Sequence, residues 1–506
     1  MRKQKAETYR GFRTAGIRLN EELLPDLVSH RTDRVLPILY AFHQFDKAHL
    51  VMLAEERLIA AGDAAAMLRV LRETEREGFE KARLEAGGGM HSAEQVLIRK
   101  LGEEVGGRIH LARSSGDLGA IGTRIPQRDR LLDLMAELNR VREALLGVAE
   151  AHADTVMPGY THGQHAQPIT LGHHLAAWAA VLKRDFERAL QAYRRINVSP
   201  AGAAIMTGSN FPVNRQRTAE LLGFDRPASN TFDAILSHDT LLDSFFVLAV
   251  LNADLARWAD DLMLWSTSEF NMVEVPDRFC GTSSIMMQKK NPYAPQYMKG
   301  LGAASLGGLV TAFQVEKGPT GMPILDRQYS TDALWRLHDD TIRDLKWWHE
   351  LLPALRWNTS LMRTRAGRFW AQATDVAGAL VRDKGLPWRT AHQIVGILVR
   401  YGYERDLQPA DVTPALLDEA AIEYMGEPVH LSAESLRQAL DPQNFVRSRS
   451  IFGGPAPEEV RCRLAEFRAT LQRDDADYQA ARRQIDRAKE KLEAAVEAVL
   501  DMAAAR

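Results

Sequence analysis

The chain has 506 residues, with 64 Lys and Arg against 66 Asp and Glu, and a formal net charge of −2. Single hydrophobic cores stop growing well below this length, so we expect two or three domains or one very elongated one. The balanced charge argues against a dedicated nucleic-acid binder and against a membrane-surface protein, while leaving room for a local basic site that binds a small acidic ligand.

The cysteine content and the lengths of the apolar runs indicate the cellular compartment in which the chain resides. Two cysteines, Cys280 and Cys462, are too few for a disulfide framework and predict a reducing, cytoplasmic setting. The basic N-terminus, residues 1–13, leads into no apolar segment of a signal peptide. The longest apolar run, residues 245–251, is far too short to span a bilayer, so we expect no membrane segment.

Helical periodicity dominates the sequence, and strand signals are scarce. Apolar residues recur at intervals of three and four over residues 128–157, 168–195 and 240–266, and Asp239 is a candidate N-cap for the last stretch. Long helices with few breakers predict a mainly α fold built on a helix bundle. A coiled-coil rod is the alternative. However, a coiled coil places apolar residues at only two of every seven positions, and these apolar stripes are wider and richer in aromatic residues.

Turn-rich segments divide the helical stretches. Residues 198–214 separate two of them, and residues 274–284 and 317–328 form two more loops. Beyond about residue 365 shorter helices alternate with Pro and Gly. The charged, Ala-rich residues 474–502 predict one exposed helix or a tail that faces a partner.

The first candidate binding segment is LARSSGDLGAIGTR, residues 111–124. Its Gly and Ser residues suggest a phosphate-binding turn. However, it lacks the Gly-Lys-Thr/Ser ending of a Walker loop, and no strand-like run precedes it, as a dinucleotide fingerprint requires. A Ser-rich turn around Ser114 and Ser115 that binds a carboxylate is the more economical interpretation.

The second candidate segment, residues 157–175, contains four histidines. A metal pair is conceivable because His162 and His165 are three residues apart, but no acid or Cys lies nearby to complete a ligand set, so we expect no metal. Thr161 and His162 predict a turn that offers a hydroxyl and an imidazole to a cleft. His is the usual proton carrier near neutral pH, although a lone His is often simply packed or solvated.

The third candidate segment, GTSSIMMQKKNP at residues 281–292, combines hydroxyl, ammonium and amide groups and contains no acid. Lys289 and Asn291 could hold a carboxylate through charge and an amide, and the backbone N–H groups of a Ser-rich turn can bind an anion. Beside such positive potential the hydroxyl of Ser283 or Ser284 loses its proton more easily, as a base requires. A flexible, solvated loop is the alternative.

Together these segments resemble the argininosuccinate lyase branch of the fumarase/aspartase superfamily. Residues 281–292 are similar to the superfamily signature Gly-Ser-Ser-x-Met-Pro-x-Lys-x-Asn, and residues 157–174 are similar to the second region of argininosuccinate lyases. The segment RSSGDLGAIGTR stands where the first region is expected. Further stretches that agree with this branch are AELLGF at 219–224, LMLWSTSEF at 262–270 and GGPAPEEVR at 453–461.

The resemblance implies a homotetramer of mostly helical, three-domain subunits. The central helices form a long bundle shared between subunits, and each active site takes its three regions from three different subunits. On this basis we expect an N-terminal helical domain at 1–113, a central helix-bundle domain at 114–365 and a C-terminal helical domain with an extra terminal helix at 366–506.

The resemblance also implies an elimination that forms fumarate and needs neither a cofactor nor a metal. A proton leaves the carbon next to a carboxylate, and a nitrogen or oxygen leaving group departs. By motif position Ser283 is the base, and Lys289 and Asn291 hold the substrate carboxylate. Thr161 and His162 contact the substrate from the opposite side and assist proton movement. The other substrate-binding residues that we predict are Ser114, Ser115, Ser284 and Gln328.

Several positions depart from the family pattern. Met287 replaces the Pro of the signature, and Gln296 replaces a Glu that orients the active-site His. Ser115 and Gly116 stand in place of the Arg and Asn of the first region. In the segment 323–331 a Gln remains, but the family's Tyr and two Lys do not.

Several of the lost groups belong to the arginine end of the family's pocket, whereas the fumarate end is largely intact. We therefore expect a carbon–nitrogen lyase that eliminates fumarate from an N-substituted aspartate other than argininosuccinate. The alternatives are a true argininosuccinate lyase, another elimination on a non-succinyl substrate, and a catalytically silent structural relative. The expected partners are a small dicarboxylate-containing substrate and further copies of the chain, not nucleic acid or membrane.

Overall fold

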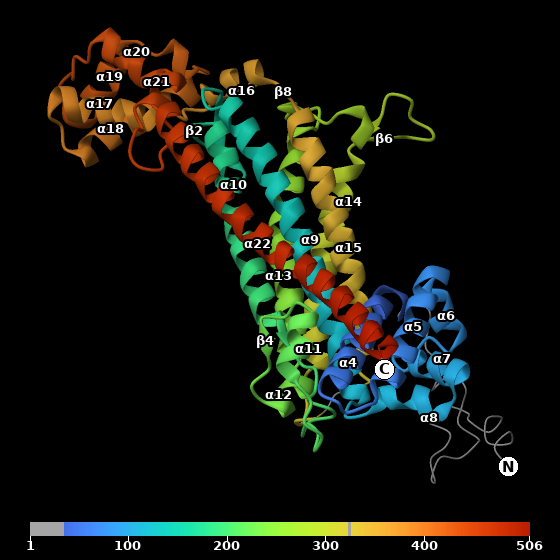
Figure 1. The fold of residues 1–506 in the computed structure, drawn as a ribbon. Helices are drawn as coiled ribbons and strands as arrows, with labels where there is room; N and C mark the ends of the chain where they lie inside the picture. The colour runs from blue at the N-terminus through green and yellow to red at the C-terminus, as the bar shows by residue number, and fades with distance from the viewer. Residues whose placement is uncertain (1–34, 322–324, 506) are drawn as a thin grey trace.

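The computed structural model describes residues 35–321 and 325–505 (Figure 1). The basic N-terminus, residues 1–13, and positions 323 and 324 of the segment compared above lie outside the described residues. The described part is mainly helical, as predicted, with short strands that form four two-stranded sheets. No helix within it is long and apolar enough to cross a membrane.

An N-terminal group of helices packs around its own core, in which Phe45 and Leu53 are fully buried. A buried ion cluster joins this group to the bundle, because Asp46 accepts hydrogen bonds from Arg83 and, at 2.6 Å, from Arg113. Breaking a buried pair is costly, so this cluster fixes the chain just before the first candidate segment. The elements are η1 (Leu36–Ile38), α4 (Leu39–Glu55), α5 (Ala61–Glu77), α6 (Phe79–Glu85), α7 (Ser92–Leu101), α8 (Glu103–Gly106) and η2 (Gly107–His110).

Long helices form the central bundle, and the three predicted apolar stripes are confirmed as helical. Trp178 stacks on Trp258 with ring centroids 4.6 Å apart, and Trp348 packs edge-on against both. These buried aromatic rings explain why the stripes are wider than a coiled-coil seam. The bundle helices are α9 (Ser115–Ala151), α10 (Leu171–Ile196), α13 (Asp239–Trp265), α14 (Tyr293–Val315) and α15 (Gln328–Leu351).

The helix ends differ from the sequence predictions. The stripe predicted over 128–157 misses the start of α9, where small and polar residues weaken the apolar pattern, and it runs past the end of the helix into a strand. The N-cap of α13 is His238, whose side chain makes no cap hydrogen bond. Asp239 is therefore the first helical residue, and its prediction as the cap is wrong by one position.

Short elements connect the bundle helices at both ends (Figure 1). β1 pairs antiparallel with β2, β5 with β8, and β6 with β7, whereas β3 and β4 pair in parallel. These elements are β1 (Val156–Thr161), β2 (Gln164–Thr170), β3 (Val198–Ser199), α11 (Arg215–Leu221), β4 (Arg226–Pro227), α12 (Thr231–Leu236), β5 (Val273–Glu274), η3 (Asp277–Phe279), β6 (Gly281–Thr282), β7 (Lys290–Asn291), η4 (Leu352–Ala354), β8 (Arg356–Trp357) and α16 (Thr359–Ala366).

A further group of short helices follows, as predicted for the chain beyond about residue 365. Its core buries Leu380, Ile394 and Leu417 completely. Its elements are α17 (Ala373–Lys384), α18 (Trp388–Glu404), η5 (Pro409–Asp411), α19 (Pro414–Met425), α20 (Ala433–Leu440) and α21 (Pro442–Arg447). The three domain boundaries stay predictions.

Helix α22 (Pro457–Ala504) leaves this group and runs back along the bundle to the N-terminal helices (Figure 1). It packs against α9, α10, α4 and α5, and Ile485, Leu492 and Val496 are buried on its inner face. The buried Lys47 of α4 forms an ion pair with Glu493. The predicted C-terminal helix is therefore confirmed, but one of its faces is packed where an exposed helix was expected.

Candidate active site

The first candidate segment forms the start of α9. Ser114 is the N-cap, and its Oγ accepts a hydrogen bond from Gly116 N at 3.2 Å. Asp117 Oδ2 accepts from Ser114 N at 2.9 Å, which completes a capping box. Asp117 Oδ1 also accepts from Ala204 N at 3.1 Å, so the turn is tied to the 198–214 loop. Burial raises the pKa of Asp117 to about 6, although the backbone donors oppose this shift.

Gly116 lies where a side chain does not fit. A Cβ at this position would lie 2.5 Å from Ala204 O and 3.1 Å from Ile205 Cα, and both are main-chain atoms. The Asn that the family carries here could be accommodated only if a loop moved. Ser115, the first helical residue, is half-buried beside it. The Ser-x-x-Asp spacing is a sequence signal for the capping box, but Asp117 was not among the predicted site residues.

The second candidate segment forms a β-hairpin. β1 and β2 pair antiparallel, and Thr161 lies opposite Gln164, so His162 and Gly163 make the turn. Their φ angles are +54° and +72°, as a two-residue hairpin turn of type I′ requires. This left-handed conformation is uncommon for a residue other than Gly. The turn predicted around Thr161 and His162 is confirmed, with both side chains exposed, whereas the strands on either side were not predicted.

Two of the other histidines of this segment, His165 and His174, are packed against aromatic rings. The ring of His165 has its centroid 5.0 Å from that of Tyr160 and 4.7 Å from that of Phe369. The ring centroid of His174 lies 5.1 Å from that of Trp265, and burial lowers the pKa of His174 to about 4. These rings support the hairpin and the bundle, and they leave His162 as the exposed imidazole of the turn.

The third candidate segment projects from one end of the bundle as a hairpin loop (Figure 1). β6 and β7 pair at its base, and residues 283–289 form its tip. Ser283 Oγ accepts hydrogen bonds from Ile285 N at 3.3 Å and from Met286 N at 3.0 Å. Such donors stabilise an oxygen that loses its proton. Met287, which replaces the Pro of the signature, is 97% exposed, so the tip stands in solvent.

The two lysines of this loop differ in their surroundings. Lys290 Nζ forms ion pairs with Glu274 at 2.9 Å and with Asp277 at 2.6 Å, which offset its charge. The exposed side chain of Lys289 makes no hydrogen bond or ion pair with any described residue. The half-buried amide of Asn291 also has no partner within the described chain. Lys289 and Asn291 can therefore receive a substrate carboxylate.

The remaining predicted residues lie on the loop and on two helix ends. Ser284 is exposed next to Ser283 on the loop tip. Gln296, which replaces the family's Glu, is exposed in the first turn of α14. Gln328 is the first residue of α15.

A single chain places these residues at opposite ends of the bundle (Figure 1). The 37 residues of α9 span about 55 Å and separate the Ser114 turn from the hairpin. The 23 residues of α14 span about 35 Å between the 281–292 loop and the far end of the bundle, where Arg327 donates to Leu236 O at 3.3 Å. Thr161, His162, Ser283, Ser284, Lys289 and Asn291 therefore lie at one end, and Ser114, Ser115 and Gln328 at the other.

One group of side chains outside these segments has the spacing of metal ligands. Among the described residues, ligand atoms of His91, Glu94 and His110 all lie within 4.8 Å of one another. Glu94 Oε2 already pairs with His110 Nδ1 at 2.9 Å and with His91 Nδ1 at 3.5 Å. Burial raises the pKa of Glu94, but the hydrogen bonds from the two rings outweigh it and lower that pKa to about 2. The cluster ties α7 to η2, just ahead of the Ser114 turn.

Known proteins match the chain over most of its length. A model of the lyase family matches residues 4–307, and a model of the argininosuccinate lyase C-terminal region matches residues 370–447. The argininosuccinate lyase of Methanosarcina acetivorans is 36% identical over 473 residues, which cover 94% of this chain and 95% of the relative. The chain belongs to the argininosuccinate lyase family. A second family member, from Methanocaldococcus jannaschii, is 37% identical over 88% of this chain and 91% of its own length.

Solved structures agree with this family. EDDS lyase in complex with formate is 32% identical, with a TM-score of 0.86 over 93% of both chains. An EDDS lyase variant with bound fumarate is 30% identical, with the same TM-score over 95% of this chain and 99% of the other. A class II fumarase from Schistosoma mansoni, 16% identical with a TM-score of 0.65 over 81% of this chain and 90% of the other, shares the fold. The protein is thus a carbon–nitrogen lyase with the helical fold of the fumarase/aspartase superfamily.

Proposed function

We propose that the protein eliminates fumarate from an N-substituted aspartate whose nitrogen partner differs from that of argininosuccinate. The family membership supports the elimination, and the available side chains of Lys289 and Asn291 support a dicarboxylate substrate. The proposal of a different nitrogen partner rests on the surroundings of Gly116, where Ala204 and Ile205 leave no room for the family's Asn. The similarity to EDDS lyase agrees with a different nitrogen partner.

In the proposed reaction, Ser283 Oγ takes the proton from the carbon next to the substrate carboxylate. The electron pair of the broken C–H bond moves onto that carboxylate, which becomes doubly negative, and Lys289 and Asn291 stabilise it. The C–N bond then breaks, the C=C bond of fumarate forms, and the nitrogen leaves with the bonding electrons and gains a proton. Preset donors around a developing charge are each worth about 10²–10³ in rate.

The remaining residues complete this mechanism. Thr161 and His162, on their exposed turn, contact the substrate from the side opposite the loop, and His162 serves the leaving nitrogen as a proton donor. Ser114, Ser115, Ser284 and Gln328 are proposed to bind the rest of the substrate. The 281–292 loop stands in solvent, so closure over the substrate would exclude water and bring Ser283 to the reacting carbon.

We also propose that the working enzyme is a homotetramer with composite active sites. The bundle of one chain holds the candidate residues tens of ångströms apart, by about 55 Å along α9 alone. An exposed apolar stripe on α14, with Leu306 58%, Val310 53% and Phe313 55% exposed, offers a surface for other copies. Antiparallel association of bundles would bring the loop end of one copy to the Ser114 end of another.

Fumarate release by the purified protein tests the proposed reaction. The substrates are argininosuccinate and a panel of N-substituted aspartates, each given to the wild type and to Ser283→Ala. We expect fumarate from a panel member and none from the variant. Efficient release from argininosuccinate would instead make the protein a true argininosuccinate lyase. No fumarate from any substrate would leave a non-succinyl substrate or a silent relative.

Mixing two inactive variants tests the composite site. Ser283→Ala and His162→Ala remove groups from two different regions, which the family pattern, with each region of a site on a different subunit, assigns to different subunits of one site. After the two proteins are dissociated and reassembled together, random mixing should restore about a quarter of the sites. Absence of recovery, with both variants confirmed as tetramers and exchanging subunits, would place both residues on one chain.

A further inference from the structure

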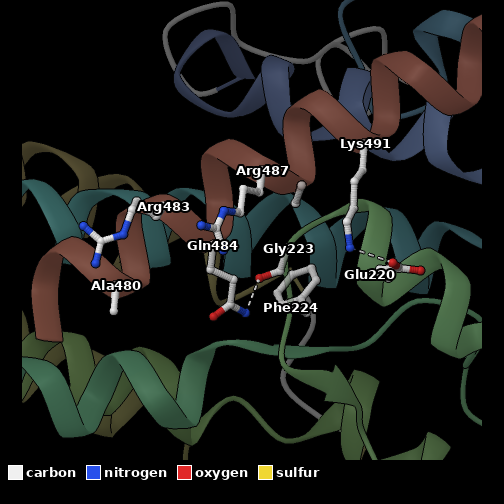
Figure 2. A pocket seen from close by; sticks show the side chains of 9 residues that line it. Glu220, Gly223, Phe224, Ala480, Arg483, Gln484, Arg487 and Lys491 are labelled. Atoms are coloured by element: carbon white, nitrogen blue, oxygen red, sulfur yellow. Dashed lines mark hydrogen bonds and ion pairs between the residues drawn. The ribbon is translucent and has the colours of Figure 1, made fainter.

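A groove lies between α22 and the turn that follows α11 (Figure 2), and this turn packs in the same hydrophobic cluster as Leu118 near the Ser114 end of the bundle. The volume of this open groove is about 630 Å³. Its lining includes Phe224 and Glu220 on one side and Arg483, Gln484, Arg487 and Lys491 of α22 on the other. The groove therefore joins two stretches that the proposed reaction does not use, the AELLGF motif and the charged C-terminal helix.

A close backbone contact builds the floor of this groove. Gly223 has a φ of +76°, and a Cβ there would lie 3.1 Å from both Ala488 Cβ and Ile485 Cδ1. Gln484 Nε2 donates to Gly223 O at 3.2 Å and to Asp225 Oδ1 at 2.8 Å. The next residue, Phe224, is buried. The turn is thus fixed against the helix, and the groove walls are held before any ligand arrives.

The wall of the groove carries uncompensated positive charge. Along the rest of α22, Arg461, Arg468 and Arg482 pair with acids of the bundle region. Within the groove, Lys491 Nζ pairs with Glu220 at 2.9 Å (Figure 2).

Arg483 and Arg487 differ, because neither makes a hydrogen bond or ion pair with any described residue. Four residues apart, they lie on successive turns of one helix face, with Cβ atoms about 6 Å from each other. Two exposed guanidinium groups thus line the groove without a hydrogen-bonded or ion-paired acid of their own.

We propose that this groove binds a small molecule that carries phosphate groups. Guanidinium groups bind phosphate through paired, planar hydrogen bonds, and two of them one helical turn apart suit neighbouring phosphates. The volume lies within the range of about 300–1,000 Å³ typical of small-molecule sites.

Calorimetric titration of the full-length protein with pyrophosphate tests this site. Inorganic phosphate and succinate serve as comparators at constant ionic strength, so that phosphate is distinguished from a carboxylate. We expect one saturable site per chain for pyrophosphate, weaker binding of phosphate, and no displacement by fumarate. The double variant Arg483→Gln/Arg487→Gln should bind pyrophosphate about tenfold or more weakly, since each guanidinium–phosphate hydrogen bond that is lost contributes strongly to the affinity.

A second double variant controls for general charge attraction. The variant Arg473→Gln/Lys489→Gln also loses two positive charges, but from exposed positions of α22 outside the groove. It should bind pyrophosphate as the wild type does. The proposal fails if the wild type shows no saturable binding, or if succinate binds as well as pyrophosphate. Equal affinity in the two double variants, or displacement by fumarate, would also overturn it.

Discussion

The two ends of the bundle present their candidate residues in opposite ways. At one end the 281–292 loop and the His162 turn project into solvent, with few contacts to the rest of the chain. At the other end the Ser114 turn is capped, half-buried over the buried Asp117, and closed around Gly116. An exposed loop can move to meet a substrate, whereas a packed turn can only fit or exclude it. We infer that the loop end carries the chemistry and that the packed end limits the substrate.

The largest expected effect comes from removing the proposed base. Ser283→Ala should lower kcat about 10²–10⁴-fold, because general-base catalysis contributes about that much, and should leave the unfolding temperature unchanged on this exposed loop. Fumarate release under saturating substrate measures it. Ser284→Ala is the matched control and should lose far less. An equal loss in both variants would mean that the loop acts by its shape and not through one hydroxyl.

The neighbouring lysines allow a sharper comparison within the loop. Lys289→Met should lower kcat/KM about 10²–10³-fold, because it removes a donor from the developing charge. Lys290→Met should cost only a few-fold, since Glu274 and Asp277 already engage that ammonium. Steady-state kinetics of both variants decides the order. If Lys290→Met proved the more damaging, the assignment of the carboxylate to Lys289 would be wrong.

Titration of Asp117 tests how tightly the packed end is buried. The pKa of this carboxyl is about 6 in the folded protein and 3.8 in an unstructured chain, so protonated Asp117 stabilises the fold at low pH. This stabilisation is lost as the pH rises through 6. The difference in unfolding free energy between wild type and Asp117→Asn should therefore shift by about 2–3 kcal/mol between pH 4 and pH 7. Denaturant unfolding at several pH values measures it, and a flat difference would contradict the burial.

The smallest expected effect concerns the glycine of the same turn. Gly116→Ala should destabilise the protein by about 1–3 kcal/mol, because its Cβ meets Ala204 O. Gly119→Ala, three residues on in the same helix, meets nothing within 4 Å and should stabilise it by about 0.5–1 kcal/mol. Thermal unfolding of both variants provides the comparison. If Gly116→Ala were neutral, the turn would have room for the family's Asn, and the argument for a different nitrogen partner would fail.

The sequence predicted the helical bundle because its buried stripes repeat over many turns. It missed β1 and β2, since MPGYT and QHAQPIT lack the alternation of a half-buried strand. It also underestimated α22, whose buried face consists of Ala and a few aliphatic residues within a charged sequence. The motifs identified the candidate site residues, but two facts required coordinates. These are the separation of the segments along α9 and α14, and the different surroundings of Lys289 and Lys290.

The long return of α22 has a consequence for how the protein is made. Lys47 and its partner Glu493 are 446 positions apart, and Leu492 and Val496 complete the core around α4 and α5. During translation the N-terminal helices emerge from the ribosome first, yet part of their apolar surface stays uncovered until α22 has been synthesised. Chains that stop before α22 would therefore expose this surface and aggregate, so that only products that include α22 persist.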